Sequence, residues 1–380
     1  MGGCGRGETV RVMFLVAGLL AVAGNCTTAT GSQAIPPCGW PVVTTSAAAG
    51  DTAAIYWLTP IPMGPETRVV ISGAFPHARY FSVQTYTLSD GFTTTVDARL
   101  DRDIPAVAGQ NPYLGQHGST ADSYELVMRA HSRAPGEISG LPPGTDVGIS
   151  WVMLRIYLPD NPTEPTGGVP LPNLAVTHRD GAPAATVEPC ASSDPDSWGN
   201  PDVESVADPF VTSPDAAQPA TPFALPPSSL TRFPNADNRY LAAPLRWGPG
   251  RVAVVEFRAP STPDTRSGES PGLERDLRYW SVCVSSVPTL QTVQCLSDHE
   301  TVVDPDGNVR VFISASADRP VGASNWLPWG PIPNAGVAVR HMIPSAAFGQ
   351  SIHEVDGGED PFDVMGAFAP SLRYCSNGCS

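Results

Sequence analysis

Four arginines stand at matching places in two similar stretches of the chain. Arg79 begins the segment Arg-Tyr-Phe-Ser-Val, Arg278 begins Arg-Tyr-Trp-Ser-Val, and Arg155 and Arg340 lie in similar apolar segments farther along each half. A guanidinium group holds carboxylates and other anions through paired hydrogen bonds. The four arginines could therefore form one anion site in each half. The alternative is salt bridges that tie together the strands of each half, and repetition favours it because repeats share scaffolding.

A second candidate is the segment Asn-Trp-Leu-Pro-Trp at 325–329, which places two indoles and an amide beside a proline. If exposed, it is a platform for sugars or apolar rings. If buried, it closes the end of a sandwich. The ligand-binding residues that we predict in the second half are Arg278, Asn325, Trp326, Arg340 and His341.

Catalytic and metal motifs are weak. The acidic histidine clusters Asp298-His-Glu300 and His353-Glu-Val-Asp356 lack the spacing of helical zinc sites. The segment Gly268-Glu-Ser-Pro-Gly272 matches G-x-S-x-G, but it lies in a polar stretch with the composition of a loop and not between a strand and a helix, as a hydrolase nucleophile would. The chain contains no lysine, which excludes Schiff-base and lysine-base chemistry. We predict no metal and no cofactor. A catalytic site that assembles only in three dimensions stays open.

Acidic residues also cluster at 97–103 and 304–308. A calcium loop would need more oxygen ligands and a glycine in the first cluster, and a downstream glutamate in the second. We expect an ion-paired loop at the first. At the second we expect a tight hairpin, because Gly307 can supply a positive φ.

The repeated segments belong to a chain rich in turns and short strands. It has 42 prolines and 36 glycines among 380 residues, and apolar residues alternate with polar ones on both sides of each repeat. This pattern is typical of half-buried strands. We predict an all-β fold with two tandem jelly-roll-like antiparallel β-sandwiches, each of about eight strands, related by internal duplication.

The boundaries follow composition. A stretch rich in Pro, Asp and Ser separates the two halves, as expected of a linker. The predicted parts are a signal peptide (1–25), a first sandwich (36–190), a linker (191–235), a second sandwich (236–345) and a C-terminal tail (346–380).

The N-terminus predicts export. Arg6 and Arg11 precede an apolar run, 12–24, of signal-peptide length. Cleavage after Ala23 would give a secreted protein, whereas lipidation of Cys26 would anchor the chain to the cell envelope. The formal net charge of −15 argues against nucleic acid and anionic membranes as partners. We expect a membrane contact only through the lipid.

Cysteine positions predict three disulfides in an oxidising compartment. One bridge would join the ends of the first lobe, one would cross a hairpin, and one would close a small terminal loop. The proposed pairs are Cys38–Cys190, Cys283–Cys295 and Cys375–Cys379.

Several segments of the second half together resemble a known family. They are Arg278-Tyr-Trp-Ser, Asp306-Gly-Asn-Val-Arg-Val, Asn325-Trp-Leu-Pro and Val339-Arg340. This set, over about residues 240–345, resembles the bacterial domain-of-unknown-function family 1214. The first half matches only weakly, since it has no Asn-Trp-Leu-Pro segment. The resemblance implies a β-sandwich that is commonly attached to a related β-domain in exported proteins, and it implies no chemistry.

Two functions are therefore kept. The first is an exported cell-envelope protein that binds a small molecule or polymer without catalysis, through the sandwich end near Asn325 and Trp326. The second is an envelope hydrolase with a nonstandard acid/base site in the second lobe. The hydrolase requires a titratable pair with shifted pKa values in a cleft, and the binding protein does not.

Overall fold

The structure is a computed structural model, and it describes residues 36–43, 49–89, 92–114, 122–178, 184–190, 217–227, 233–287 and 290–376. The predicted signal peptide, Cys26 and most of the predicted linker lie outside these ranges. The described part is built from strands, short 3₁₀ turns and one short α-helix, α1 (Pro361–Met365). The predicted all-β fold with two lobes is confirmed.

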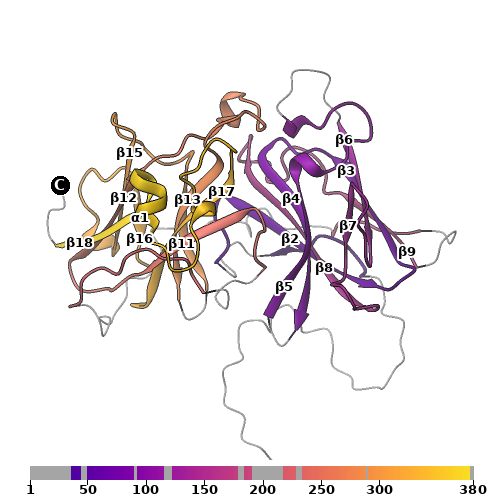
Figure 1. Ribbon diagram of the computed structural model, residues 1–380, viewed down its shortest axis with the longest axis horizontal. Helices are drawn as coiled ribbons and strands as arrows, with labels where there is room; N and C mark the ends of the chain where they lie inside the picture. Colours follow the sequence, from indigo (N-terminus) through magenta and orange to yellow (C-terminus); the bar gives the residue numbers. More distant parts are fainter. Residues whose placement is uncertain are drawn as a thin grey trace, which may run out of the picture. The chain divides into compact units, whose positions relative to one another are not determined.

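The first lobe consists of two packed sheets, drawn in indigo to magenta in Figure 1. Its strands are β1 (Val42–Val43), β2 (Ala54–Met63), β3 (Arg68–Ala74), β4 (Ala78–Ser89), β5 (Phe92–Leu100), β6 (Ser123–Arg129), β7 (Glu137–Ser139), β8 (Gly148–Pro159), β9 (Asn173–Thr177) and β10 (Ala185–Val187). The inner sheet, which faces the second lobe, has the order β1-β2-β8-β4-β5. The outer sheet, which faces away from it, has the order β10-β9-β3-β6-β7.

The second lobe, in orange to yellow, also has two sheets. Its strands are β11 (Asn238–Pro244), β12 (Arg251–Arg258), β13 (Leu277–Ser286), β14 (Thr292–Ser297), β15 (Asn308–Ser314), β16 (Trp326–Pro328), β17 (Ala335–Pro344) and β18 (Ser371–Ser376). The inner sheet has the order β11-β17-β13-β14, and the outer sheet has the order β16-β15-β12-β18.

The two lobes share one strand arrangement. Taken in chain order, β2 to β9 have the same neighbours in their sheets as β11 to β18. Within the described residues, β1 and β10 have no counterpart. The expected eight strands per sandwich are therefore found as a common unit.

Each sandwich departs from the predicted antiparallel pairing at one place. The short strand β7 runs parallel to β6, and β16 runs parallel to β15. Both β7 and β16 pair only with the last three residues of the longer strand. The connecting loop therefore has to return along only three residues of that strand before the short strand begins. This explains how consecutive strands become parallel without a long crossover.

Each lobe has its own apolar core between its two sheets. Val152, Leu154 and Ile156 of β8 point into the first core, as their alternation predicts. The same alternation would place Leu158 on this face, but Leu158 packs on the opposite one. Its φ of 44° lies in the left-handed region, which turns the strand at this point. Ile343, at the matching place in β17, has a φ of 47°.

A third apolar cluster lies between the lobes. It combines tyrosines of β2, β4 and β8 with Tyr279 of β13 and Met342 of β17. Each inner sheet is therefore covered on both faces, by its own outer sheet and by the other lobe. This arrangement brings the repeated arginines together.

The second lobe is larger than the sequence pattern indicated. β18 pairs along β12, so the lobe extends to Ser376 instead of ending at 345. Met365 of the predicted tail is fully buried in the core. Phe223, within the predicted linker, packs in the same core. These segments are rich in Pro, Gly and Ala, which hides their contribution to a core from a periodicity argument.

Two of the predicted disulfides are present. Cys38 pairs with Cys190 at a Cα–Cα distance of 4.8 Å, and Cys283 pairs with Cys295 at 4.0 Å. Cys375 is also disulfide-bonded, whereas Cys379 lies outside the described residues. Disulfides are typical of an oxidising compartment outside the cytoplasm.

Candidate binding site between the two lobes

Two buried ion pairs cross the boundary between the lobes in the same manner. Arg79 at the start of β4 contacts Asp298 at 2.7 Å, and Arg278 at the start of β13 contacts Asp101 at 2.9 Å. Each aspartate is the first residue after a matching edge strand, β14 or β5. The arginines therefore do not tie together the strands of one sandwich, as the salt-bridge alternative supposed. They tie one lobe to the other.

The same two arginines also form hydrogen bonds to each other's main chain across the boundary between the lobes. Nη1 of Arg79 donates to the carbonyl oxygen of Arg278 at 3.5 Å, and Nη1 of Arg278 donates to that of Arg79 at 3.3 Å. The contact is thus reciprocal, like the contact between identical subunits of a two-fold dimer.

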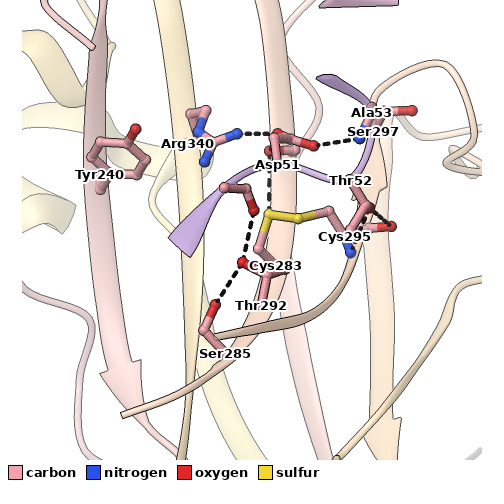
Figure 2. The surroundings of a disulfide bond; sticks show 12 residues. Asp51, Thr52, Ala53, Tyr240, Cys283, Ser285, Thr292, Cys295, Ser297 and Arg340 are labelled. Carbon is pink, nitrogen blue, oxygen red and sulfur yellow. Dashed lines mark hydrogen bonds and ion pairs between the residues drawn. A yellow bond between two sulfur atoms is a disulfide. The ribbon is translucent and has the colours of Figure 1, made fainter. Parts of the chain in front are cut away.

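Asp51 provides a third contact between the lobes. This residue precedes β2 in the first lobe, and its carboxylate forms an ion pair with Arg340 of β17 (Figure 2). The same carboxylate accepts hydrogen bonds from Tyr279 Oη at 2.8 Å and Ser281 Oγ at 2.7 Å. The Asp51 charge is completely buried and is balanced by one guanidinium group. Figure 2 also shows the Cys283–Cys295 disulfide close to Asp51.

Asp237 takes the corresponding role on the other side, with a different partner. It precedes β11 as Asp51 precedes β2, and it accepts from Tyr80 Oη at 2.5 Å and from Gln84 Nε2 at 3.5 Å. Burial raises the pKa of Asp237. Among the described residues it forms no ion pair.

Arg155 of β8 stands where Arg340 stands in the second lobe. Its Nη2 donates to Tyr86 Oη and to the carbonyl oxygen of Phe233, both at 2.7 Å. Its guanidinium carbon lies 5.5 Å from the centre of the Tyr86 ring. The side chain is buried, and its Nη1 has no hydrogen-bond partner among the described residues.

A cavity of about 190 Å³ opens between the lobes beside these two arginines. Arg155 and Arg340 both line it, together with the rings of Tyr56, Tyr157 and Tyr240. Most of the remaining lining is apolar and comes from β8, β17 and the segments that precede β2 and β11. The exposed Val287 also belongs to this lining.

Burial controls protonation around the cavity. It raises the pKa of Tyr86 to about 12 despite the nearby Arg155, and it raises the pKa of Tyr56 and Tyr157 as well. These hydroxyls therefore stay neutral at physiological pH. Burial also raises the pKa of Asp101 to about 6, and the Arg278 guanidinium only partly opposes this rise.

The five ligand-binding residues that we predicted do not form one site. Arg278 and Arg340 face the first lobe, and of the five only Arg340 lines the cavity between the lobes. Asn325 and Trp326 lie in the second lobe at β15 and β16. His341 is buried beside Ile352.

The Asn325 segment is buried, as in the sandwich-closing alternative. Asn325 exchanges two hydrogen bonds with the main chain of Val302, at 2.8 and 2.7 Å. Trp326 Nε1 donates to Ser314 Oγ at 2.9 Å, and the Arg319 guanidinium lies over its ring. These contacts fix a loop to the sheet.

His341 is neutral in this environment. Its Nδ1 accepts a hydrogen bond from the main-chain N–H of Ile352 at 3.3 Å, and burial lowers its pKa to about 3. His353 Nε2 lies 3.1 Å from the carbonyl oxygen of His341. The two histidines thus interact within the second lobe, and neither lines the cavity between the lobes.

The other acidic clusters are divided among separate partners. Asp298 contacts Arg79, whereas the neighbouring Glu300 accepts from the N–H and hydroxyl of Ser297. Among the described residues, one group has metal-ligand spacing: Asp51 with Cys283 and Cys295. Those two cysteines form a disulfide and cannot act as thiolate ligands.

Sequence reasoning missed Asp51, Asp237 and the tyrosines of the contact face. Asp101 and Asp298 were noticed only as members of local clusters. Alignment of β5 with β14 would have shown that Asp101 and Asp298 directly follow matching strands. No comparable signal marks Asp51, because its partners in the second lobe are more than 200 residues away: Tyr279, Ser281 and Arg340.

No helix in the described part of the chain is long and apolar enough to cross a bilayer. No model of a known protein family matches the chain, and no curated protein matches it.

Comparison with solved structures finds similar chains. The chain is similar to an uncharacterized protein from Burkholderia cenocepacia, with a TM-score of 0.52 and 14% identity over 89% of this chain and 82% of that one. It is also similar to a protein from Vibrio parahaemolyticus, with a TM-score of 0.43 and 12% identity over 86% and 90% of the two chains. At such identities, the comparison with the Burkholderia protein shows a shared fold and nothing about function.

Proposed function

We propose that this chain is an exported cell-envelope protein that binds a small, largely apolar molecule between its two lobes without catalysis. The observation that carries the proposal is the cavity of about 190 Å³ lined by tyrosine rings and two buried arginines. Mostly apolar cavities with a few polar groups are typical of small-molecule sites. The proposed place differs from the Asn325 region because the Asn325 and Trp326 side chains are buried and hydrogen-bonded to their own lobe.

The lining favours binding over hydrolysis. The described residues of the cavity wall include no carboxylate, histidine or cysteine. General acid–base catalysis requires such a group within hydrogen-bond reach of the reacting atoms. His341, the histidine among the predicted site residues, is buried and is not part of this wall. We therefore prefer the binding function.

Export and anchoring are part of the proposal. The disulfides Cys38–Cys190 and Cys283–Cys295 support a compartment outside the cytoplasm. The N-terminal sequence supports a signal peptide, with free secretion or lipidation at Cys26 as the two outcomes. Incorporation of radiolabelled palmitate, with Cys26→Ser as the control, distinguishes them.

The evolutionary proposals rest on the strand arrangement. The matching neighbours of β2 to β9 and β11 to β18 support internal duplication. The segments Arg278-Tyr-Trp-Ser and Asn325-Trp-Leu-Pro remain the support for membership of domain-of-unknown-function family 1214.

The binding function can be tested with the neutral fluorescent probe N-phenyl-1-naphthylamine. We expect saturable enhancement of its fluorescence with the wild-type protein. Ala338→Phe, which places a ring in the cavity wall, should weaken binding about tenfold or more. Ala317→Phe is the matched control, because Ala317 is exposed and is not part of this wall. Absence of saturable binding, or equal binding by all three proteins, would contradict the proposal.

A further inference from the structure

The two matching arginines of the cavity differ in how their charge is balanced. Arg340 is paired with the carboxylate of Asp51. Arg155 forms no ion pair with any described residue, although it occupies the same place relative to its sheet. Arg155 lies opposite Tyr56 and Ser82 in the strand register, as Arg340 lies opposite Tyr240 and Ser281.

The contacts that Arg155 makes are with neutral groups. Tyr86 offers a hydroxyl oxygen and Phe233 a main-chain carbonyl, each 2.7 Å from Nη2. Asp237 interacts with Arg155 electrostatically, but its carboxylate is held by Tyr80 at 2.5 Å and lies outside ion-pair distance of Arg155. The guanidinium charge is therefore buried without a contacting anion.

Such an arrangement is costly unless something completes it. A buried donor without a partner loses the hydrogen bond that it makes in water, and a charged donor loses more. Arg155 is 2% exposed, its Nη1 has no partner among the described residues, and it lines the cavity. The unpartnered donor and the unpaired charge thus belong to the same side chain, at the wall of a mostly apolar cavity.

We infer that the ligand of this cavity is an amphiphile with one carboxylate, whose charge the Arg155 guanidinium balances, while its apolar part packs against Met153, Val337 and Leu290. One negative group would balance the charge of the Arg155 guanidinium. The apolar walls would exclude a heavily charged or sugar-like molecule. This inference rests on the proposed function and adds the chemical class of the ligand.

Displacement of N-phenyl-1-naphthylamine by octanoate and by 1-octanol tests the inference, because the two competitors share a chain and differ in the head group. We expect octanoate to displace the probe at a concentration at least about tenfold lower than 1-octanol. Arg155→Gln should abolish this preference, and Arg155→Lys should restore part of it. Arg310→Gln, which removes an exposed arginine of the outer sheet, should keep it.

The possible outcomes separate the two proposals. Displacement by both competitors without a preference for octanoate would overturn the carboxylate inference and leave the binding function intact. Failure of the probe to bind would overturn both. If Arg155→Gln does not fold, as judged by thermal unfolding, the wild-type preference between octanoate and 1-octanol decides the matter alone.

Discussion

Arg79 and Arg278 lie against each other across the boundary between the lobes, and each donates to the main-chain oxygen of the other. Their guanidinium groups then continue to Asp298 and Asp101, each of which belongs to the opposite lobe. Four buried charges are thus arranged so that neither lobe balances its own arginine.

Asp298→Asn should strongly destabilise the protein at pH 8. It leaves the buried Arg79 charge without an anion, and loss of one partner of a buried pair costs about 3–5 kcal/mol. Urea unfolding followed by fluorescence measures the change. The control is Glu256→Gln, which removes a partly exposed partner of Arg310 and Arg373 and should cost less than about 1 kcal/mol. Equal losses in the two variants would show that the crossed pair contributes no more than a surface pair.

His341 should make the fold sensitive to acid. Its pKa is lowered to about 3 in the fold, against about 6.5 in the unfolded chain. Its neutral form therefore contributes stability that is present above pH 6.5 and is lost as pH falls towards 3, by up to ~5 kcal/mol. His341→Asn keeps an acceptor for Ile352 N–H and should lose less stability between pH 7 and pH 4. Parallel slopes for wild type and variant would contradict this account.

Asp101 should act in the opposite direction. Its pKa is raised to about 6 by burial, so its contribution is present below pH 4 and is lost as pH rises through 6. Asp101→Asn should therefore show a more positive slope of unfolding free energy against pH between 4 and 6 than the wild type. Urea titrations at half-unit pH steps measure this slope. A less positive slope in the variant would mean that Arg278 outweighs burial in setting this pKa.

The two described disulfides should contribute unequally. Cys38–Cys190 closes a loop with a sequence separation of 152, whereas Cys283–Cys295 closes one of 12. Chain-entropy arguments predict about 5 kcal/mol for the first and about 3 kcal/mol for the second. Paired Cys→Ser variants of each bridge, compared by thermal unfolding, test the order. A larger loss from removal of Cys283–Cys295 would indicate that its contact with the Asp51 segment dominates.

The inner sheets could be predicted from the sequence because their strands are long and alternate regularly. The Arg79 and Arg278 segments became β4 and β13, and the Arg155 and Arg340 segments became β8 and β17. In contrast, β18 has a weak pattern and pairs with β12, which lies more than 100 residues earlier. Local periodicity holds no information about such a partner.

The site was harder to predict than the fold, for a related reason. The residue types indicated that the arginines bind anions or form ion pairs. The partners of Arg79, Arg278 and Arg340 could not be identified, because they belong to the other lobe and lie far away in sequence. The burial of Asn325 and Trp326 likewise depends on which edge the loop covers. The asymmetry between Arg155 and Arg340 arises from the segments before β2 and β11, because the first supplies Asp51 to Arg340 and the second supplies the Phe233 carbonyl to Arg155.

The ion pairs Arg79–Asp298 and Arg278–Asp101 can form only after both halves of the chain have been synthesised. Asp298 follows Arg79 by 219 positions, so every residue of the first lobe is synthesised long before the anion that pairs with Arg79. At about 5–20 residues per second, the ribosome needs on the order of ten seconds or more to make the second half. The tyrosine-rich face of the first lobe can therefore be covered by its own second lobe only after the second half of the chain has been made.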